Sequence, residues 1–194
     1  MFKKITTFIV FFVLPTTMVH AGGFVQVLGD FGGRNIIADF SQNTNNADLP
    51  AGKGVGVSMG WRVPLRDGES GSYSLHLATG YKYQSLSPVT TARVKWSHWA
   101  SEVLLLHRPI RSNFGLGVGL QYHAGNILKF EGTWLNDDVG FAPAFGVSGL
   151  FEWSVVPEFS TQLRLSYLQY VATDTEISYP ALTLGLGLTY FYSE

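Results

Sequence analysis

The chain has 194 residues, with 13 Lys and Arg, 14 Asp and Glu and no cysteine, so its formal net charge is −1. A charge this close to zero does not point to a nucleic-acid partner, and the lack of cysteine excludes a disulfide framework. Beyond the first 21 residues the sequence has no run of about 18 apolar residues, so we expect no transmembrane helix there.

The first stretch, MFKKITTFIVFFVLPTTMVHA, has the layout of a secretory signal peptide. Two lysines precede a short apolar run, which ends at the small-x-small cleavage site Val19-His20-Ala21. We therefore expect residues 1–21 to direct export and residues 22–194 to form one domain. The alternative is a transmembrane anchor, but the apolar run is short and contains a proline and two threonines.

The rest of the chain alternates between apolar residues and small or polar residues with a period of two, which is typical of β-strands. The expected strands, in chain order, are about 23–31, 54–63, 72–83, a segment within 93–107, 114–123, 141–153, 161–170 and 181–192. The two faces of the fourth of these segments are the least clear. No convincing helix lies between them, so the sequence predicts an all-β fold.

In the first half of the chain, strand 54–63 alternates most clearly. It has valines, a methionine and a tryptophan on one face, and mainly glycine and serine with Arg62 on the other. Strand 72–83 has tyrosines and leucines on one face, and the opposite face carries His76 and Lys82. Each strand therefore has one apolar face and one face of small and polar residues.

In the second half, strand 114–123 reads FGLGVGLQYH, with three glycines followed by Gln121 and His123 on the face opposite the apolar residues. The next two strands place Glu152 and Arg164 on the corresponding face. In the last strand, leucines and tyrosines alternate with glycines and threonines. The same two-faced pattern therefore recurs to the end of the chain.

The connections between the expected strands alternate in length. Short turns, PLRDGES, RPIRSN and SVVPEFS, follow the second, fourth and sixth strands and carry turn-forming residues. The other connections are mostly longer and polar. The first, RNIIADFSQNTNNADLPAGK, is the longest, and the third includes KFEGTWLNDDV. Short turns at one end and longer loops at the other are typical of outer-membrane barrels.

The composition of the two faces indicates which one points inward. In a soluble lipocalin-type barrel the apolar face would point inward, and the glycine, serine and alanine face would meet water. Small residues suit the inside of a narrow eight-stranded barrel better. We therefore expect the glycines to lie inside, where they make space for larger polar neighbours such as Gln121, His123, His76 and Arg164, and the apolar face to meet lipid.

Aromatic residues support this orientation because they are expected in two girdles around an apolar band. The girdle near the short turns would contain Trp61, Tyr73, Phe114, Trp153, Tyr190 and Tyr192, and the girdle near the long loops Tyr81, Tyr83, Tyr122 and Phe141. Closing the sheet would also pair every backbone polar group in lipid. The sequence thus predicts an eight-stranded antiparallel transmembrane β-barrel with an up-and-down meander.

On these features the chain resembles the small outer-membrane β-barrel proteins of Gram-negative bacteria, the OmpA/OmpX/OmpW-like group. The segment GLTYFY near the C-terminus resembles the last-strand signal that the barrel-assembly machinery reads, with Gly187, Tyr190 and Tyr192 as its residues. It departs from the usual pattern because Ser193 and Glu194 follow the last aromatic residue. The stretch AGKGVGVSMGWRV resembles an uncharacterised family of exported barrels, which implies no function.

The resemblance implies a location in the cell outer membrane. It also implies contact with outer-membrane lipid and lipopolysaccharide, and the barrel-assembly machinery as a partner. It implies no nucleic-acid partner. It does not identify a ligand for the surface loops.

Several polar residues are expected inside the barrel. A network that fills the lumen would consist of Arg62, His76, Lys82, Glu102, Gln121, His123, Glu152 and Arg164. A charge in a narrow barrel is costly unless it is paired, so we expect Arg164 to pair with Glu102 or Glu152, with Glu102 favoured. The alternative is a charged gate on a narrow pore.

Catalytic and metal-binding patterns are weak. Ser97 and His98 are adjacent, but neighbouring strand residues point to opposite faces, so they should not form a nucleophile and base pair. Asn136, Asp137 and Asp138 could hold calcium, but a lone acidic loop is usually solvated. The sequence has no HExxH motif and no Walker loop. We therefore expect no cofactor, no metal and no enzyme activity.

The leading functional prediction is an integral outer-membrane barrel with a structural or surface-interaction role and a filled lumen. Two alternatives stay open. One is a narrow channel for small or apolar solutes, and the other is a lipid A-modifying outer-membrane enzyme.

Overall fold

The computed structural model describes residues 22–36, 49–89, 92–132 and 137–192. The expected signal peptide, 1–21, lies outside the described residues, so its prediction stays a prediction. Within the ranges described, no helix combines the length and the apolar character that crossing a membrane requires.

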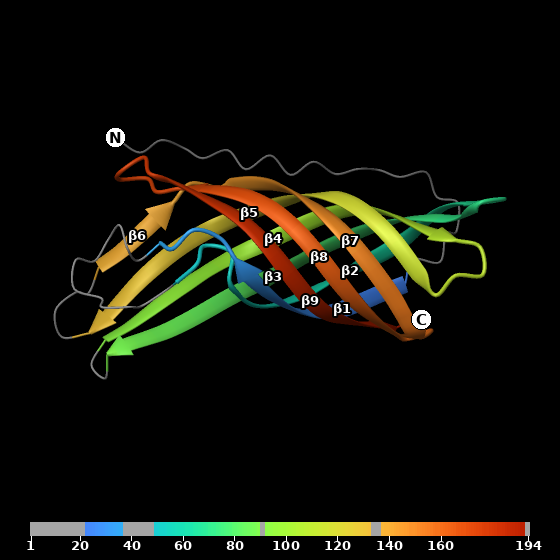
Figure 1. Ribbon diagram of the computed structural model, residues 1–194, viewed down its shortest axis with the longest axis horizontal. Helices are drawn as coiled ribbons and strands as arrows, with labels where there is room; N and C mark the ends of the chain where they lie inside the picture. The colour runs from blue at the N-terminus through green and yellow to red at the C-terminus, as the bar shows by residue number, and fades with distance from the viewer. Residues whose placement is uncertain (1–21, 37–48, 90–91, 133–136, 193–194) are drawn as a thin grey trace.

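The described chain forms a closed antiparallel barrel (Figure 1). Its strands are β1 (Gly22–Gly32), β2 (Gly54–Gly68), β3 (Gly71–Val89), β4 (Ala92–Pro109), β5 (Phe114–Gly132), β6 (Asp137–Phe141), β7 (Ala144–Val156), β8 (Phe159–Val171) and β9 (Ser178–Tyr192). Strands β1, β2, β3, β4, β5, β7, β8 and β9 pair with one another in this order, and β9 pairs with β1, which closes the ring. The predicted eight-stranded meander is confirmed.

The barrel has two different ends (Figure 1). We call the end with the connections β2–β3, β4–β5 and β7–β8 the short-turn end, and the opposite end the long-loop end. The C-terminus lies at the short-turn end and β6 at the long-loop end. Strands β3, β4 and β5 are 18 or 19 residues long, so they extend beyond the length of about 10 residues that crosses a membrane.

Strand β5 has two partners along its length. Its first part, Phe114–His123, pairs with β7, and Asn126–Phe130 pairs with β6. The predicted strand 141–153 is therefore wrong at its start, because Phe141 ends β6 and β7 begins at Ala144. A proline lies in the break between them and cannot donate a ladder hydrogen bond. Likewise, part of the predicted third long loop is strand.

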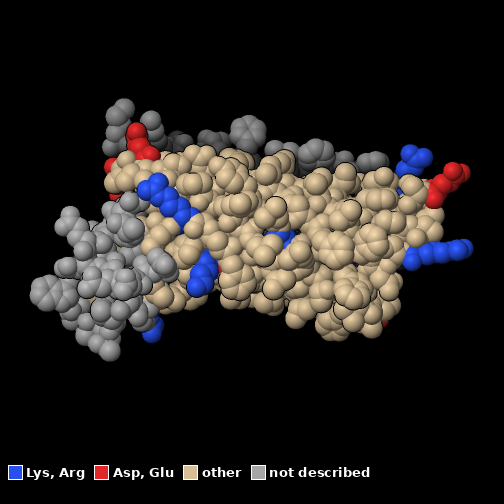
Figure 2. Space-filling model, in the orientation of Figure 1, with Lys and Arg blue, Asp and Glu red and all other residues tan. Residues whose placement is uncertain are grey.

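The apolar face of the barrel points outward, as predicted. Val118 and Leu120 are each 67% exposed, whereas Gln121 and His123 on the other face are buried. On the side of the molecule shown in Figure 2, charged side chains gather mainly toward the two ends and leave a largely uncharged middle. This surface matches the apolar band of a transmembrane barrel.

The outward aromatic residues follow the two predicted girdles with one exception. Trp61 and Trp153 near the short turns are exposed, and so are Tyr81 and Tyr122 nearer the long loops. Phe141 is only 6% exposed and packs inside the barrel. Its assignment to the outer girdle was wrong because it belongs to β6, where the alternation differs from that of β7.

Gly115, Gly117 and Gly119 of β5 face the interior, but the residues that occupy their space differ from the prediction. A Cβ atom at Gly117 would lie 3.3 Å from Leu106 Cδ1, and one at Gly119 would lie 2.8 Å from Leu104 Cγ. The glycines therefore make space for leucines of β4 and not directly for polar side chains. Leu104 and Leu106 form a small apolar cluster with Leu150 of β7.

Candidate functional site

The interior of the barrel is the candidate functional site because buried polar and charged side chains gather there. From the short-turn end to the long-loop end, it contains a cluster around Glu152, an ion pair between Arg164 and Glu102, and an ion pair between Lys82 and Asp30. An apolar cluster follows at the long-loop end.

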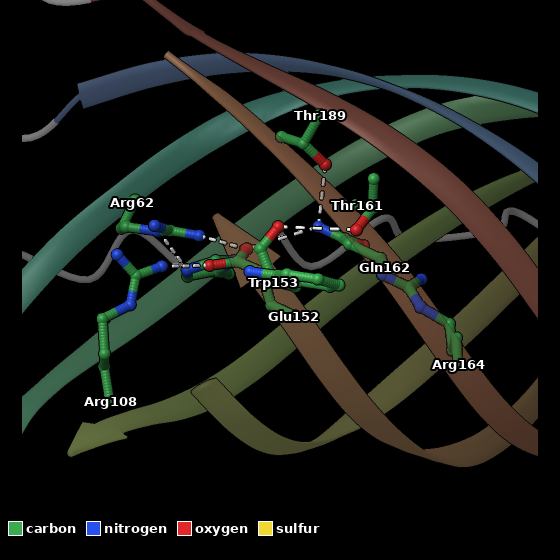
Figure 3. A network of polar contacts seen from close by, with 9 residues as sticks. Arg62, Arg108, Glu152, Trp153, Thr161, Gln162, Arg164 and Thr189 are labelled. Atoms are coloured by element: carbon green, nitrogen blue, oxygen red, sulfur yellow. Dashed lines mark hydrogen bonds and ion pairs between the residues drawn. The ribbon is translucent and has the colours of Figure 1, made fainter. Parts of the chain in front are cut away.

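The first group, which we call the short-turn cluster, consists of Arg62, His76, Arg108, Glu152, Gln162 and Thr189 (Figure 3). Arg62 Nη2 and Arg108 Nη2 each donate a hydrogen bond of 2.5 Å to a different carboxylate oxygen of Glu152. Glu152 is fully buried, whereas the two arginines are partly exposed. Two cations share one carboxylate, so this end of the interior has one excess positive charge.

Arg62 has two further contacts that fix its position. Its Nε donates a hydrogen bond to Nε2 of His76 on the neighbouring strand β3. Its guanidinium carbon lies 4.1 Å from the centroid of the Phe191 ring of β9, which is a cation–π geometry. Side chains from β3 and β9 thus hold Arg62 in place beside Glu152.

The central pair is Arg164 and Glu102, which the sequence favoured as partners. Arg164 Nη1 donates to Glu102 Oε2 at 2.6 Å, and both side chains are less than 10% exposed. The other oxygen of Glu102 accepts hydrogen bonds from Gln121 Nε2 at 3.3 Å and Ser148 Oγ at 3.0 Å. The carboxylate therefore receives three donors from three strands, which offsets its loss of hydration.

Gln162 links the central pair to the short-turn cluster (Figure 3). Its Oε1 accepts a hydrogen bond from Arg164 Nη2 at 3.4 Å, and its Nε2 donates to Glu152 at 3.5 Å and to Thr189 at 2.7 Å. These contacts form a chain of polar side chains from the short-turn end to the middle of the barrel.

The outer pair is Lys82 of β3 and Asp30 of β1. Lys82 Nζ lies 2.7 Å from Asp30 Oδ2 and also donates to the carbonyl oxygen of Gly52 at 2.6 Å. Gly52 belongs to the connection between β1 and β2. One buried ammonium therefore connects two strands to the segment that follows the first long loop.

Two stacked histidines lie between the outer pair and the apolar cluster. The rings of His98 and His123 are 4.4 Å apart, and His123 Nδ1 lies 2.7 Å from the Tyr170 hydroxyl. His98 is completely buried, and its two ring nitrogens have no hydrogen-bond partner within the described part of the chain.

An apolar cluster, which we call the plug, fills the long-loop end of the interior. Its buried residues are Ile36, Leu49, Ala51, Val94, Trp96, Leu128, Phe141, Ala144, Leu168, Tyr170, Ala172, Tyr179 and Ala181. Ile36, Leu49 and Ala51 belong to the first long loop, and all three have no exposed surface. Trp96 Nε1 donates to the carbonyl oxygen of Ala51 at 3.1 Å, which ties this segment to β4.

All eight residues that the sequence assigned to the lumen point into the barrel, but they fall into separate groups. Arg62, His76 and Glu152 belong to the short-turn cluster, Arg164, Glu102 and Gln121 meet in the middle, and Lys82 and His123 lie nearer the plug. These placements are geometric, and a functional role for the network stays a prediction.

Sequence reasoning missed Asp30, Arg108 and the plug. Asp30 lies on the same face of β1 as Phe24 and Gln26, so the period-two alternation of β1 would have placed it inside the barrel. The sequence prediction placed Arg108 in a turn because the predicted fourth strand stopped before it, whereas β4 includes it. The plug had no comparable signal, since Ile36 and Leu49 belong to what the sequence presents as a polar loop.

Of the residues in the calcium candidate, Asn136 lies outside the described part of the chain. Asp138 lies 3.3 Å from Lys129 in an ion pair, and no group of three or more potential metal ligands exists among the described residues. His98 is buried within the interior, whereas its neighbour Ser97 lies on the other side of the strand.

The residues predicted to form the assembly signal lie on β9 near the short-turn end. Gly187 faces the interior, and Tyr190 and Tyr192 face outward with about two fifths of their surface exposed. This is the alternation that the predicted signal requires, and its recognition by the assembly machinery stays a prediction.

The fold matches solved structures of small outer-membrane barrels. The attachment invasion locus protein Ail of Yersinia pestis superposes with a TM-score of 0.57 and 9% identity, covering 89% of this chain and 97% of that chain. Neisserial surface protein A gives a TM-score of 0.53 and 9% identity, covering 87% of this chain and 96% of that chain. Ail in complex with the heparin analogue sucrose octasulfate gives a TM-score of 0.53 at 10% identity, covering 89% of this chain and 97% of that chain.

No family model and no curated protein sequence matches the chain. At identities of 9% and 10%, the structural matches establish the fold alone. The predicted resemblance to the OmpA/OmpX/OmpW-like group is confirmed at that level.

Proposed function

We propose that this protein is an integral outer-membrane β-barrel with a closed lumen and a structural or surface-interaction role. The observation that carries the proposal is the interior itself. Ion pairs occupy its middle, and plug residues such as Trp96, Tyr170 and Leu49 have no exposed surface at the long-loop end. A packed interior supports a barrier better than it supports general solute flow.

The proposal includes an orientation and a set of partners. The short-turn end faces the periplasm and the long-loop end faces outward, as is usual for such barrels. The exposed leucines and aromatic residues contact outer-membrane lipid, and the long-loop end contacts lipopolysaccharide. Gly187, Tyr190 and Tyr192 serve as the signal for the barrel-assembly machinery.

Conductance across a planar lipid bilayer tests the closed lumen. The refolded native protein should produce no stepwise currents. Leu128→Asp places a charge in the plug and should make opening events frequent, whereas Ile127→Asp on the adjacent outward position should leave the barrel closed. Steady conductance by the native protein would overturn the proposal in favour of the narrow channel.

A lipid A-modifying enzyme is the other alternative. Ser97 and His98 face opposite sides of β4, which argues against a nucleophile and base pair at that position. Mass analysis of lipid A from cells with and without the gene tests this alternative. A mass change that depends on the gene would contradict a purely structural role.

A further inference from the structure

The barrel contains an internal cavity of about 60 Å³ between the central pair and the outer pair. The residues that supply charge or hydrogen-bonding groups to its wall include Asp30, Lys82, Glu102, Gln121, His123 and Arg164. Both ion pairs therefore border the same space.

The cavity exists because most inward side chains on one side of the wall, apart from Lys82 and Glu102, are small. Strands β2, β3 and β4 contribute Gly56, Ser58, Ala78, Gly80 and Ala100 at this level. Large side chains from the opposite wall do not fill this space, because Glu102 holds both Arg164 and Gln121 through hydrogen bonds. The space is thus a consequence of side-chain sizes on three adjacent strands.

Three buried polar atoms belong to residues that line this cavity and lack a hydrogen-bond partner within the described part of the chain. They are Asp30 Oδ1, Gln121 Oε1 and Arg164 Nε. Each of the three side chains is more than nine-tenths buried. Buried polar groups in native proteins are almost always hydrogen-bonded, so three such atoms around one cavity indicate an occupant.

The charges and the hydrogen-bonding groups define that occupant. Lys82 is balanced by Asp30, and Arg164 by Glu102, so the cavity does not require an ion. Its unpartnered atoms include two acceptors and one donor, so the occupant must both donate and accept hydrogen bonds. Water does both, and each water needs roughly 10–15 Å³ of such space.

We propose that this cavity is a binding site for a cluster of about four water molecules that bridges the two ion pairs. The cluster continues the polar chain that runs from Glu152 through Gln162 to Arg164. Beyond Lys82 and the two stacked histidines, the plug supplies apolar side chains. The dry layer that separates the interior from the long-loop end is therefore the plug and not the polar network.

Two N–H groups of the native protein provide a direct test. Arg164 lines the proposed water site, and its Nε–H has no hydrogen-bond partner within the described part of the chain, whereas Trp96 Nε1–H donates to the Ala51 carbonyl inside the plug. In ¹⁵N-labelled protein refolded in detergent micelles, a water-selective NOE experiment should give a cross peak from long-lived water at Arg164 Nε–H. It should give none at Trp96 Nε1–H.

A pair of variants adds a second test. Ala100→Leu fills the cavity and should abolish the water cross peak at Arg164. Gly149→Leu is the matched control, because a Cβ atom there meets nothing within 4 Å and its strand position faces lipid. The control should keep the cross peak.

Three results would overturn the proposal. One is the absence of a cross peak at Arg164 Nε–H in the folded native protein. Another is a cross peak of equal strength at Trp96 Nε1–H, which would mean that water enters the plug as well. The third is an unchanged Arg164 cross peak in folded Ala100→Leu. None of these depends on whether the native barrel conducts ions, so a failure here is distinct from a failure of the proposed closed lumen.

Discussion

At the scale of single residues, the interior is organised by carboxylates that each collect several donors. Glu152 accepts from two arginines, and Glu102 accepts from Arg164, Gln121 and Ser148. A buried ion pair gains stability only when such additional hydrogen bonds replace the lost water. Removing one of these buried cations should therefore lower the free energy of unfolding more than removing an exposed cation of the same type.

Arg164→Ala tests this expectation. It leaves Glu102 buried without a cation, so the free energy of unfolding should fall by about 3–5 kcal/mol. Adding Glu102→Ala should recover part of the lost free energy of unfolding, because the double variant no longer contains an unpaired buried carboxylate at this position. Denaturant unfolding from lipid vesicles, followed by tryptophan fluorescence, measures both changes.

Arg66→Ala is the matched control for Arg164→Ala. Arg66 is exposed near the short-turn end, and its removal should change the free energy of unfolding by less than about 0.5 kcal/mol. If the two single variants were equally stable, the Arg164–Glu102 pair would not be desolvated as the structure indicates.

At the scale of elements, a bulge at Gly125 decides which residues of β5 face inward. Ser97 pairs with Ile127 but Trp99 pairs with Ala124, so β5 has one extra residue opposite β4. Gly125 lies at this bulge with a φ of 62°, in the left-handed region that favours glycine. The bulge shifts the inward set from odd to even positions, which places Leu128 in the plug.

Gly125→Val should be destabilising, because a β-branched residue disfavours the left-handed conformation by about 1–2 kcal/mol. Ala124→Val at the neighbouring outward position introduces the same side chain without that conformational strain. Thermal unfolding in micelles measures both variants. Equal destabilisation by the two valines would show that the bulge does not control the register of β5.

At the scale of the whole molecule, closing the sheet allows an apolar outer surface to coexist with a charged interior. Every wall strand pairs on both sides, so the backbone groups of the lipid-facing band are satisfied without disulfides. The outer surface can then consist of side chains such as Val118, Leu120 and Leu184, all largely exposed.

Val118→Arg places a charge in the lipid-facing band and should lower the free energy of unfolding by roughly 2–4 kcal/mol. Thr175→Arg, in the exposed β8–β9 connection, is the control and should have little effect. Refolding into lipid vesicles, followed by gel mobility, compares the two. Similar refolding defects in both variants would contradict the assignment of the lipid face.

The orientation in the membrane gives a separate prediction. The chain has no cysteine, so single cysteines can be introduced at Thr175 near the long-loop end and at Glu69 near the short-turn end. An impermeant thiol reagent on intact cells should label position 175 and spare position 69. Labelling in the opposite pattern would reverse the proposed orientation, and lysed cells should be labelled at both positions.

The sequence by itself determined that the fold is a closed eight-stranded wall and which face of most strands points inward. The alternation that carries this information is local, since successive side chains on a strand always point to opposite faces. Arg62, Lys82, Glu152 and Arg164 could therefore be placed inside before any strand partner was known. Glycine and serine opposite leucine then indicated that the apolar face meets lipid.

The tertiary structure alone decided which interior residues meet and how the long-loop end is closed. Phe141 faces inward because β6 and β7 are separate strands, and Leu128 does so because Gly125 shifts the register of β5. Ile36 and Leu49 enter the plug from a connection that reads as polar. These outcomes depend on pairing between strands distant in sequence, and a local period of two contains no information about such pairing.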